Sequence, residues 1–271
     1  MRLYFLMIIS VVMLSCNKEA ALTPSDFGKL YTLPQGNNSY DDSIMACYNK
    51  YQTYILYKFT QQDYVYNYIE LKTDSAFVAN PLYISAALRF LHTELLNVYP
   101  ESFLQKTMPF KILLAAYLGS GTNRNPKGFA STISMLAIGW ADSALAQKTP
   151  AELKLLRGYM HRYYNERAYR VDLVKVPAEF AALAPALYGS VNAANKYSLG
   201  VLDPHGNDLN LASDFLSYIE VITSQSKAQL EAGILRPAVD TKGLIRKKYN
   251  IVLNYFQTGF GVDLQAIGER P

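Results

Sequence analysis

A histidine on a predicted helix is the residue with the clearest catalytic potential in this chain. His161 opens the segment 161–165, which reads HRYYN. In the metal-binding pattern H-E-x-x-H, two histidines four residues apart share one helix face and bind zinc, and the glutamate polarises a zinc-bound water as general base. Here Arg162 stands at the position of the base and Asn165 at that of the second ligand. The segment therefore keeps only the first metal-ligating side chain of the pattern.

Other residue types that often carry chemistry give weaker signals. His92 lies in an apolar helical pattern and is expected to be a surface or hydrogen-bonded histidine rather than a ligand. Cys47 lies in a similar pattern and is expected to be a small buried residue. The segment Gly119-Ser120-Gly121 lacks the Gly-Lys-Ser/Thr ending of a phosphate loop, and no G-x-S-x-G segment marks a serine hydrolase. With only 2 cysteines, a disulfide framework and a cysteine zinc site are excluded.

The elements that would position His161 follow from helix caps and hydrophobic spacing. Thr149-Pro150-Ala151-Glu152 predicts a helix start with a capping box, and this helix should run to about Arg170. Other helices are predicted at 40–50, 81–99, from Asn207 or Asp208 onward, 224–232 and 241–256, and strands at 51–59, 110–117 and 131–139. Strands early and helices late predict one α+β domain, with a small mixed sheet followed by a helical C-terminal part.

Composition limits the class of protein. The chain has 271 residues, of which 50% are hydrophobic and 18% charged, so it can form a substantial core and is not a low-complexity chain. Its formal net charge is +4 and it has no basic block, so nothing indicates nucleic-acid binding. Tyrosine is frequent, at 22 residues, and most tyrosines are expected to pack the interior. Exposed ones, with Tyr163 and Tyr164 as candidates, would suit a glycan or peptide ligand or a partner protein.

The N-terminal segment predicts where the protein is located. Arg2 precedes a largely apolar run over 3–14, which is too short to span a bilayer and ends in Met13-Leu14-Ser15-Cys16. This resembles a bacterial lipobox, in which the cysteine is lipidated with acyl chains such as palmitate and becomes the mature N-terminus. The alternative is an ordinary signal peptide with an incidental cysteine. We therefore expect a lipoprotein signal peptide at 1–15, lipidated Cys16 and a tether at 16–40, and one domain at 41–271.

Several segments, in order, resemble a known family. They are YILYKF, a helix ending LLNVYP, ESFLQKTMPFKILLAAY, a Gly/Asn loop, SMLAIGW, the helix with His161, SDFLS at 213–217, and GFGVDLQAI. Together they resemble the zinc metallohydrolase lipoproteins of outer-membrane substrate-import loci, over roughly residues 40–267. The resemblance implies a zincin-like metallopeptidase fold and, as partners, a TonB-dependent transporter and its SusD-like lipoprotein. Lys18-Glu19 also resembles the export signal of surface-exposed lipoproteins, so an outer-membrane anchor, on the cell surface, is expected.

The departures from this family predict the loss of its chemistry. The family's Glu-Asp-Phe-Ala-Glu segment, expected to supply the third metal ligand, has Ser217 at the ligand position, while Asp214 is kept. Arg162 adds a permanent cation where a dication would bind, and the Asn165 amide is a poor zinc ligand. The expectation is a pseudoenzyme without a metal cofactor, acting as a binding or accessory subunit in nutrient import. Its cleft candidates are His161, Arg162, Tyr164, Asn165 and Asp214.

Two alternatives stay open at this stage. The resemblance implies that the segment from Gly200 to Asp214 crosses the helix that carries His161. In that case His161, His205 and Asp214 could form a new zinc site in an active hydrolase, with Asp203 nearby. The other alternative is a purely structural partner of the transporter. A cleft that is open beside Tyr164, His161 and Arg162 would favour ligand binding, whereas a cleft filled by those side chains would favour the structural role.

Overall fold

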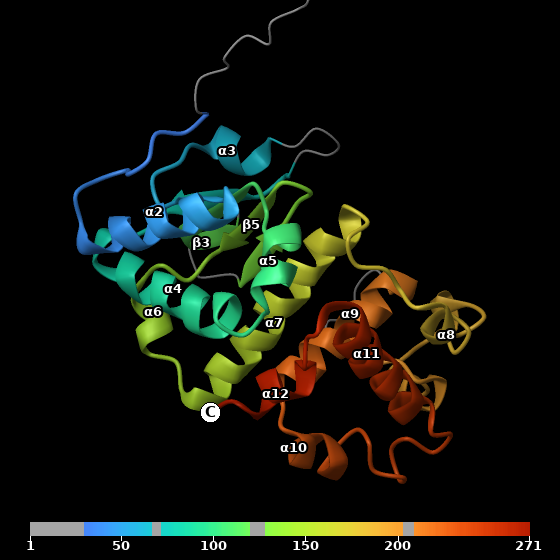
Figure 1. Ribbon diagram of the computed structural model, residues 1–271. Helices are drawn as coiled ribbons and strands as arrows, with labels where there is room; N and C mark the ends of the chain where they lie inside the picture. The colour runs from blue at the N-terminus through green and yellow to red at the C-terminus, as the bar shows by residue number, and fades with distance from the viewer. Residues whose placement is uncertain (1–29, 67–71, 120–127, 203–208) are drawn as a thin grey trace, which may run out of the picture. The chain divides into compact units, whose positions relative to one another are not determined.

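The computed structural model describes residues 30–66, 72–119, 128–202 and 209–271 (Figure 1). Contacts divide the chain into two compact units, 1–32 and 33–271, and only the second is considered below. The predicted signal peptide and Cys16 lie outside the described residues. The second unit begins at Leu33, before the predicted domain start at residue 41. Gln35 belongs to it, because its side-chain oxygen accepts hydrogen bonds from the backbone N–H groups of Tyr57 at 2.8 Å and Lys58 at 3.0 Å.

Strands and helices alternate early in the chain, and helices follow. The strands are β1 (Tyr54–Leu56), β2 (Ser75–Val78), β3 (Lys111–Gly119), β4 (Phe129–Ser131) and β5 (Met135–Ile138). The α-helices are α2 (Ser39–Tyr51), α3 (Gln61–Val65), α4 (Ile84–Leu91), α5 (Glu101–Thr107), α6 (Ser143–Ala146), α7 (Pro150–Arg170), α8 (Ala178–Ala181), α9 (Leu211–Ser224), α10 (Lys227–Ala232), α11 (Leu244–Phe260) and α12 (Leu264–Glu269). Shorter helical turns are η1 (Pro81–Tyr83), the π-helix η2 (His92–Leu96), η3 (Tyr188–Ser190) and η4 (Tyr197–Leu199).

The sheet is mixed and has β3 near its centre. Its strand order is β1-β3-β5-β4, and β2 also pairs with β3. β1 and β5 run parallel to β3, with Ile55 opposite Ile112 and Ile112 opposite Leu136, whereas β2 and β4 are antiparallel to their neighbours. Since Ile112 to Ala115 are all fully buried, both faces of β3 are covered by other elements. The predicted α+β class with an early mixed sheet is confirmed.

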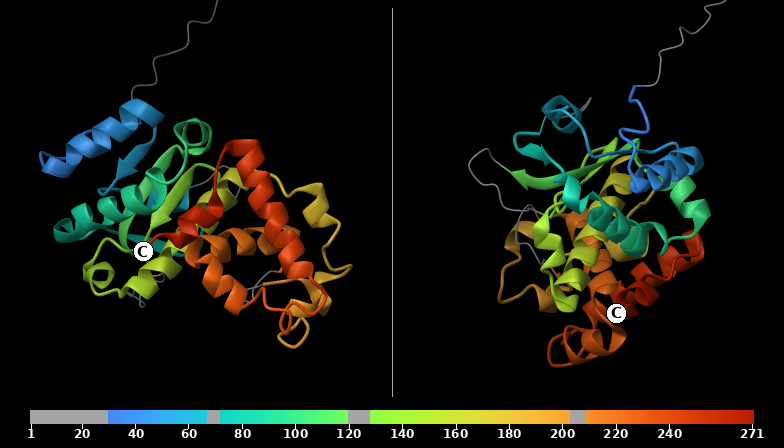
Figure 2. Two further views of the ribbon diagram at one scale, coloured as in Figure 1. Left: turned by 60° about the horizontal axis from the view of Figure 1, so that its bottom comes forward. Right: turned by 90° about the vertical axis from the view of Figure 1, so that its left-hand side faces the viewer.

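Helix α7 lies between the sheet and the C-terminal helices. It packs against β4 and β5 on one side and against α9 on the other, as Figures 1 and 2 show. The predicted capping box at its start is confirmed, since the Glu152 carboxylate accepts from the Thr149 N–H at 2.9 Å. The hydrogen bond from Lys148, followed by those from Thr149, lowers the pKa of Glu152 to about 2. Gly158 allows the close packing, because a Cβ there would lie 2.6 Å from the Glu220 carbonyl oxygen.

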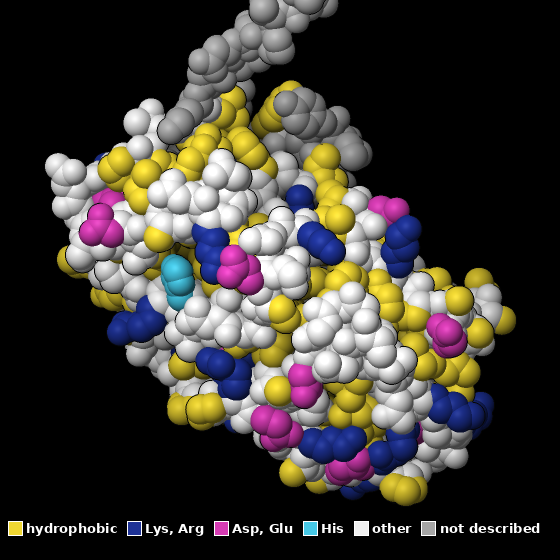
Figure 3. All heavy atoms as spheres, viewed as in Figure 1, with side chains coloured by type: hydrophobic (Ala, Val, Ile, Leu, Met, Phe, Trp, Pro, Cys, Tyr) yellow, Lys and Arg dark blue, Asp and Glu magenta, His cyan; other side chains and the backbone are white. Residues whose placement is uncertain are grey.

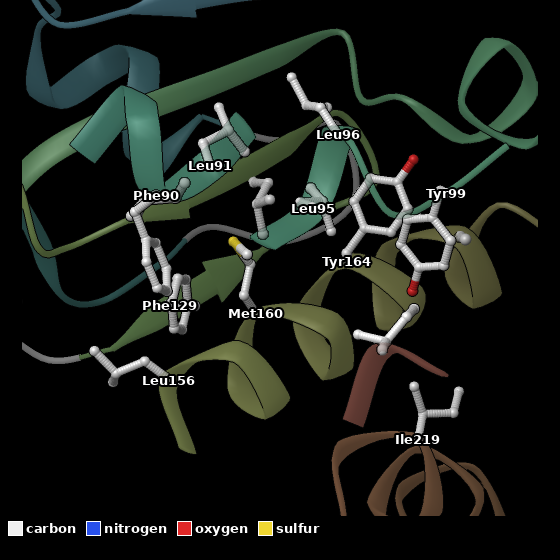
Figure 4. Close-up of a cluster of buried hydrophobic side chains, with 14 of the residues drawn as sticks. Phe90, Leu91, Leu95, Leu96, Tyr99, Phe129, Leu156, Met160, Tyr164 and Ile219 are labelled. Atoms are coloured by element: carbon white, nitrogen blue, oxygen red, sulfur yellow. The ribbon is translucent and has the colours of Figure 1, made fainter. Parts of the chain in front are cut away.

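Apolar side chains from the sheet, α4, η2, α7 and α9 meet in one core. Figure 4 shows Met160 of α7 among side chains of α4, η2 and β4, with Ile219 of α9 beyond the helix. Met160 and Ile219 are fully buried. Burying large apolar side chains of this kind stabilises a fold by about 1.5–3 kcal/mol each. The motif helix is thus fixed from two sides, by the sheet and by the C-terminal helices.

Two strand predictions were inaccurate in extent. The strand predicted at 51–59 is only β1, because α2 continues to Tyr51 and Gln52 then adopts a left-handed conformation with φ of 56°. The single strand predicted at 131–139 is the hairpin β4–β5, which turns between Thr132 and Met135 through a 2.9 Å backbone hydrogen bond. That turn carries no Gly or Pro, so the apolar run hid it.

Several helices are confirmed with shifted ends. The helix predicted from Asn207 or Asp208, which lie outside the described residues, begins at Leu211, because the Asn210 side chain caps the N–H groups of Ala212 and Ser213 at 3.0 Å. The helix predicted at 81–99 consists of η1, α4 and η2 in sequence. The helix predicted at 224–232 begins later, as α10, and ends as predicted, whereas the helix predicted at 241–256 begins and ends later, as α11. Short elements such as β2, α5 and α12 were not predicted.

The surface carries both signs of charge. On the face in Figure 3, Lys and Arg side chains alternate with Asp and Glu side chains, and neither sign forms a continuous patch there. Within the described ranges, none of the helices combines the length and apolar character that a membrane crossing requires. Cys47 is 4% exposed, in agreement with the prediction that it is a small buried residue.

Candidate functional site

The candidate residues of α7 face different neighbours because successive residues of an α-helix are about 100° apart. His161 and Asn165 face the core beside η2, whereas Arg162 faces α9. Tyr164 faces α5. Asp214 and Ser217 both lie on α9, yet they contact different partners. The candidates therefore form separate groups rather than one cleft.

His161 belongs to a buried hydrogen-bonded network with Tyr99 and Asn165. Its Nδ1 lies 2.8 Å from the Tyr99 hydroxyl, which also accepts a hydrogen bond from the Asn165 Nδ2 at 2.9 Å. Asn165 Nδ2 donates as well to the His161 carbonyl oxygen at 2.8 Å. The Tyr99 hydroxyl can accept from both side chains or donate to Nδ1, so the tautomer of His161 decides which group of this pair is the donor. The network thus links His161 to Asn165 through a single hydroxyl.

The environment of His161 keeps the ring neutral. Its exposed fraction is 0%, and burial, followed by the positive charge of Arg157, lowers the pKa of His161 to about 3. The backbone of Glu94 acts in the opposite direction, yet Nε2 makes no hydrogen bond within the described part of the chain. Burial also raises the pKa of Tyr99 well above its ordinary value. Both groups of the network therefore stay uncharged near neutral pH.

Arg162 bridges α7 and α9. Its Nη1 donates to the Ser217 Oγ at 3.0 Å and lies 3.4 Å from the Glu220 carboxylate. Ser217 in turn donates to the Ser213 carbonyl oxygen at 2.7 Å. The exposed fractions of the Arg162 and Glu220 side chains are 15% and 7%. Positions 162 and 217, the base and the third ligand of the metal pattern, thus contact each other directly through a guanidinium and a hydroxyl.

Asp214 is part of a separate, fully buried ion pair. Its carboxylate lies 2.6 Å from the Lys248 ammonium, and both side chains have an exposed fraction of 0%. The same carboxylate accepts from the Tyr188 hydroxyl at 2.9 Å, and Lys248 also donates to the Gly200 carbonyl oxygen at 3.0 Å. Burial lowers the pKa of Lys248, and the charge and hydrogen bond of Asp214 oppose this shift. The pair joins α9 to α11.

Tyr164 does not line a cleft, so this part of the prediction is corrected. Its ring is fully buried and stacks on Tyr99 with centroids 5.6 Å apart, while its hydroxyl lies 2.6 Å from that of Thr107. Figure 4 shows the two tyrosine hydroxyls pointing in opposite directions. The apolar and aromatic surroundings of α7 hold this side chain in the core. Other side chains surround His161 and Tyr164 and leave no open cleft beside them, which is the arrangement expected for a structural role.

These residues do not fit a zinc ion. Zinc needs nitrogen, sulfur or carboxylate ligands that converge on one point. The described residues contain no group of three or more His, Cys, Asp or Glu side chains placed to hold a metal. The Nδ1 of His161 is hydrogen-bonded to Tyr99, and the positively charged Arg162 donates to Ser217. The Asp214 carboxylate is already paired with Lys248. His205 and Asp203 of the alternative site lie outside the described residues.

Glu166 is not placed to act as a metal ligand beside His161 either. Its carboxylate accepts from the Ser131 hydroxyl at 2.9 Å and lies 3.1 Å from the Arg170 guanidinium. It therefore faces the β4 side of α7, away from the His161 network, as the 100° step along the helix requires.

Some residues of the site were missed by sequence reasoning. Tyr99 and Thr107 come from distant segments, and no spacing rule connects them to α7. Glu220 could have been found, because it follows Ser217 by three residues and so lies on the same face of a predicted helix. Arg157 precedes His161 by one helical turn and is 1% exposed. It donates to the carbonyl oxygen of Ile267 at 2.9 Å and lies against the Glu94 carboxylate.

Comparison with known proteins rests on structure. The fold is zincin-like. It matches a Bacteroides caccae crystal structure described as a "putative zinc-binding metallo-peptidase", with a TM-score of 0.58 and 15% sequence identity. The match covers 85% of this chain and 88% of the other. No family model and no curated protein matches the sequence. At this identity the likeness shows a shared metallopeptidase-like fold.

Proposed function

We propose that this protein is a non-catalytic zincin-like lipoprotein that serves as an accessory subunit of an outer-membrane nutrient-uptake complex. The observation that carries the proposal is the contact of Arg162 with Ser217 at 3.0 Å. These are the positions at which the family resemblance places a general base and a metal ligand. In this protein they tie α7 to α9 instead.

The charge at position 162 argues against metal chemistry. Arginine stays protonated in proteins, so its guanidinium repels a dication brought near it. Replacing the base also removes the carboxylate that would activate a water molecule. Glu220 balances the charge of Arg162 and holds it toward α9. A metal entering here would have to displace a formed ion pair.

The state of His161 supports the same proposal. Its Nδ1 already contacts the Tyr99 hydroxyl at 2.8 Å, and the ring has an exposed fraction of 0%. A metal would therefore have to enter the core to reach His161, where it would find no second and third ligand among the described residues. Asn165, meanwhile, directs its amide nitrogen to Tyr99 and to the backbone. His161 is thus a structural histidine within the core.

Metal content tests this proposal. The purified mature chain is incubated with zinc, dialysed and analysed by mass spectrometry, and we expect no stoichiometric zinc. A variant with Arg162→Glu, Asn165→His and Ser217→Glu is the matched comparison, and zinc uptake by that variant alone would assign the loss to these positions. One equivalent of zinc per wild-type chain that disappears in His161→Ala would overturn the proposal.

Location and partners are supported by sequence. The lipobox-like segment ending at Cys16 supports a lipid anchor, and Lys18-Glu19 supports export to the cell surface. The family resemblance supports a TonB-dependent transporter and a SusD-like lipoprotein as partners, with a glycan or peptide as the imported nutrient. Crosslinking in native membranes should recover both partners with the wild-type chain. Their absence, with Cys16 shown to be acylated, would contradict the assignment of partners and leave the anchor standing.

A further inference from the structure

An apolar hollow lies where the second compact unit begins. It has a volume of about 480 Å³ and is lined by Asn38, Tyr40, Tyr57, Lys58, Phe59, Val78, Ala79, Pro81 and Ile84. The lining thus joins the start of α2, the segment after β1, and the segment from the end of β2 to the start of α4. Figures 1 and 2 show the segment leading into α2 and the start of α4 on the same side of this unit.

The rim of this hollow exposes large apolar side chains. Leu82, next to Pro81 of the lining, has an exposed fraction of 83%, and Val78 has one of 53%. Tyr40 and Phe59 are partly exposed beside them. Single exposed apolar residues are common, but a group around an apolar hollow marks a surface that contacts another apolar phase. We call the surface formed by Tyr40, Lys58, Phe59, Val78 and Leu82 the Leu82 face.

The first residues of the second unit lie beside the Leu82 face. Gln35 fixes the first residues of the unit to the rim, because its side-chain amide donates to the Lys58 carbonyl oxygen at 2.6 Å. In return, the Lys58 ammonium donates to the Gln35 carbonyl oxygen at 2.7 Å. Leu33 is 17 residues after Cys16 (33 − 16), so covalent geometry limits their separation to about 60 Å. A lipid anchor at Cys16 would keep this face within reach of the bilayer.

The residue types on the Leu82 face match a lipid–water interface. Leucine, valine and phenylalanine enter the acyl boundary, while tyrosine places its ring there with the hydroxyl among headgroups. Lys58 is exposed and lies over the Tyr57 ring at 5.7 Å, so its charge can stay in the headgroup region. Asp41, next to Tyr40 of the lining, is buried and accepts from the Tyr57 hydroxyl at 2.8 Å, whereas Asp42 is exposed.

We propose that the Leu82 face lies against the lipid surface, as a second, non-covalent membrane contact beside the acylated Cys16. This inference rests on the lipid anchor proposed above. The contact would orient the domain on the membrane, with the sheet edge and α2 toward the lipid. It would also cover the apolar hollow, which lacks another cover within the described residues.

Depth-dependent fluorescence quenching tests this contact with the full mature, acylated chain. Leu82→Trp and Leu187→Trp are each reconstituted into phosphatidylethanolamine and phosphatidylglycerol vesicles with brominated acyl chains. Leu187 is the matched control, because it is 67% exposed but lies in the segment between α8 and η3. The native Trp140, at 9% exposure, gives the same background in both variants. The added emission of Leu82→Trp should be largely quenched, while that of Leu187→Trp should be retained.

The outcomes separate this inference from the proposed anchor. Equal emission of the two variants in vesicles that carry the protein would overturn the inference and leave the hollow to a protein partner. Failure of the wild-type chain to float with the vesicles would overturn the anchor, and this inference with it. Circular dichroism on both variants confirms folding, which is expected because both sites are exposed.

Discussion

Two ion pairs on helix α9 illustrate opposite uses of charge in the same fold. Asp214 pairs with Lys248 at 2.6 Å, and both side chains are fully buried. Glu220 pairs with Arg162 at 3.4 Å near the other end of the helix, and Arg162 is 15% exposed. The first pair joins α9 to α11, whereas the second includes Arg162, where the resemblance places a general base.

The two pairs differ in what it costs one charged group when its partner is removed. A fully buried charge that loses its partner keeps the whole cost of its desolvation, because water cannot replace the lost contact. A partly exposed arginine can still be hydrated when its partner is removed. Removing one member of the deep pair should therefore cost more stability than removing one member of the Arg162 pair.

The largest effect is expected from breaking the deep pair. Lys248→Met leaves the Asp214 carboxylate buried without its cation, and should lower the free energy of unfolding by about 3–5 kcal/mol. Urea unfolding followed by circular dichroism measures this change. Lys247→Met, one residue earlier and exposed, is the control and should change little. Adding Asp214→Leu to Lys248→Met should recover much of the loss, and a double variant no more stable than the single one would contradict this account.

The next effect concerns His161 in acid. Its pKa of about 3 in the folded chain lies below the ordinary 6.5, so between these values the unfolded chain binds a proton that the folded chain does not. Stability therefore falls as pH drops below about 6.5, by about 1.4 kcal/mol for each pH unit. Unfolding measured from about pH 7 to about pH 4.5 should show this slope in the wild type relative to His161→Phe. If the unfolding free energies of the wild type and of His161→Phe changed with pH in parallel, His161 would not be buried as described.

A smaller effect is expected from the hydroxyl that joins the core network. Tyr99→Phe removes the hydroxyl that hydrogen-bonds to His161 and Asn165 and should cost about 1–3 kcal/mol of unfolding free energy. Tyr169→Phe, on α7, serves as the control, since Tyr169 is 37% exposed and the loss of its hydroxyl should cost almost nothing. Thermal unfolding of both variants provides the measurement. If Tyr99→Phe and Tyr169→Phe were equally stable, the Tyr99 hydroxyl would not contribute to the network.

The smallest effect is expected at Arg162. Arg162→Met removes the contacts to Ser217 and Glu220, and should cost about 1 kcal/mol, less than Lys248→Met, because water reaches this site. Arg170→Met breaks an exposed pair with Glu166 and is the control, with an expected cost below about 0.5 kcal/mol. Denaturant titration compares the three variants. A loss at Arg162 as large as that at Lys248 would remove the distinction drawn between the two pairs.

Local patterns predicted the motif helix well. Thr149, Pro150 and Glu152 act within one helical turn, so the start of α7 could be read from neighbouring residues. The turn between β4 and β5 was missed for the converse reason, since its residues include no Gly or Pro to mark it. The start of α9 was predicted too early, because Asn207 and Asp208 are as suitable for a cap as Asn210, and the local sequence does not choose among them.

The candidate site was predicted only in part. The replaced positions 162, 165 and 217 follow from sequence alone, and the contact of Arg162 with Ser217 agrees with the expectation that these positions lie together. The cleft expected beside Tyr164 is filled by Tyr99 and Thr107. Sequence spacing could not predict these contacts, because both residues are far from Tyr164 along the chain. Asp214 was likewise grouped with His161, although Lys248 of α11 holds it elsewhere.

The sequence by itself determined which side chains are absent from the metal pattern, because residue identity decides whether a ligand or base can exist at all. It also determined the caps and the apolar faces, which depend on residues within a few positions. Only the tertiary structure decided what the remaining polar groups do: His161 bonds to Tyr99, Arg162 to Ser217, and Asp214 to Lys248. Such partners are chosen by packing between distant elements, where burial makes each unpaired polar group costly.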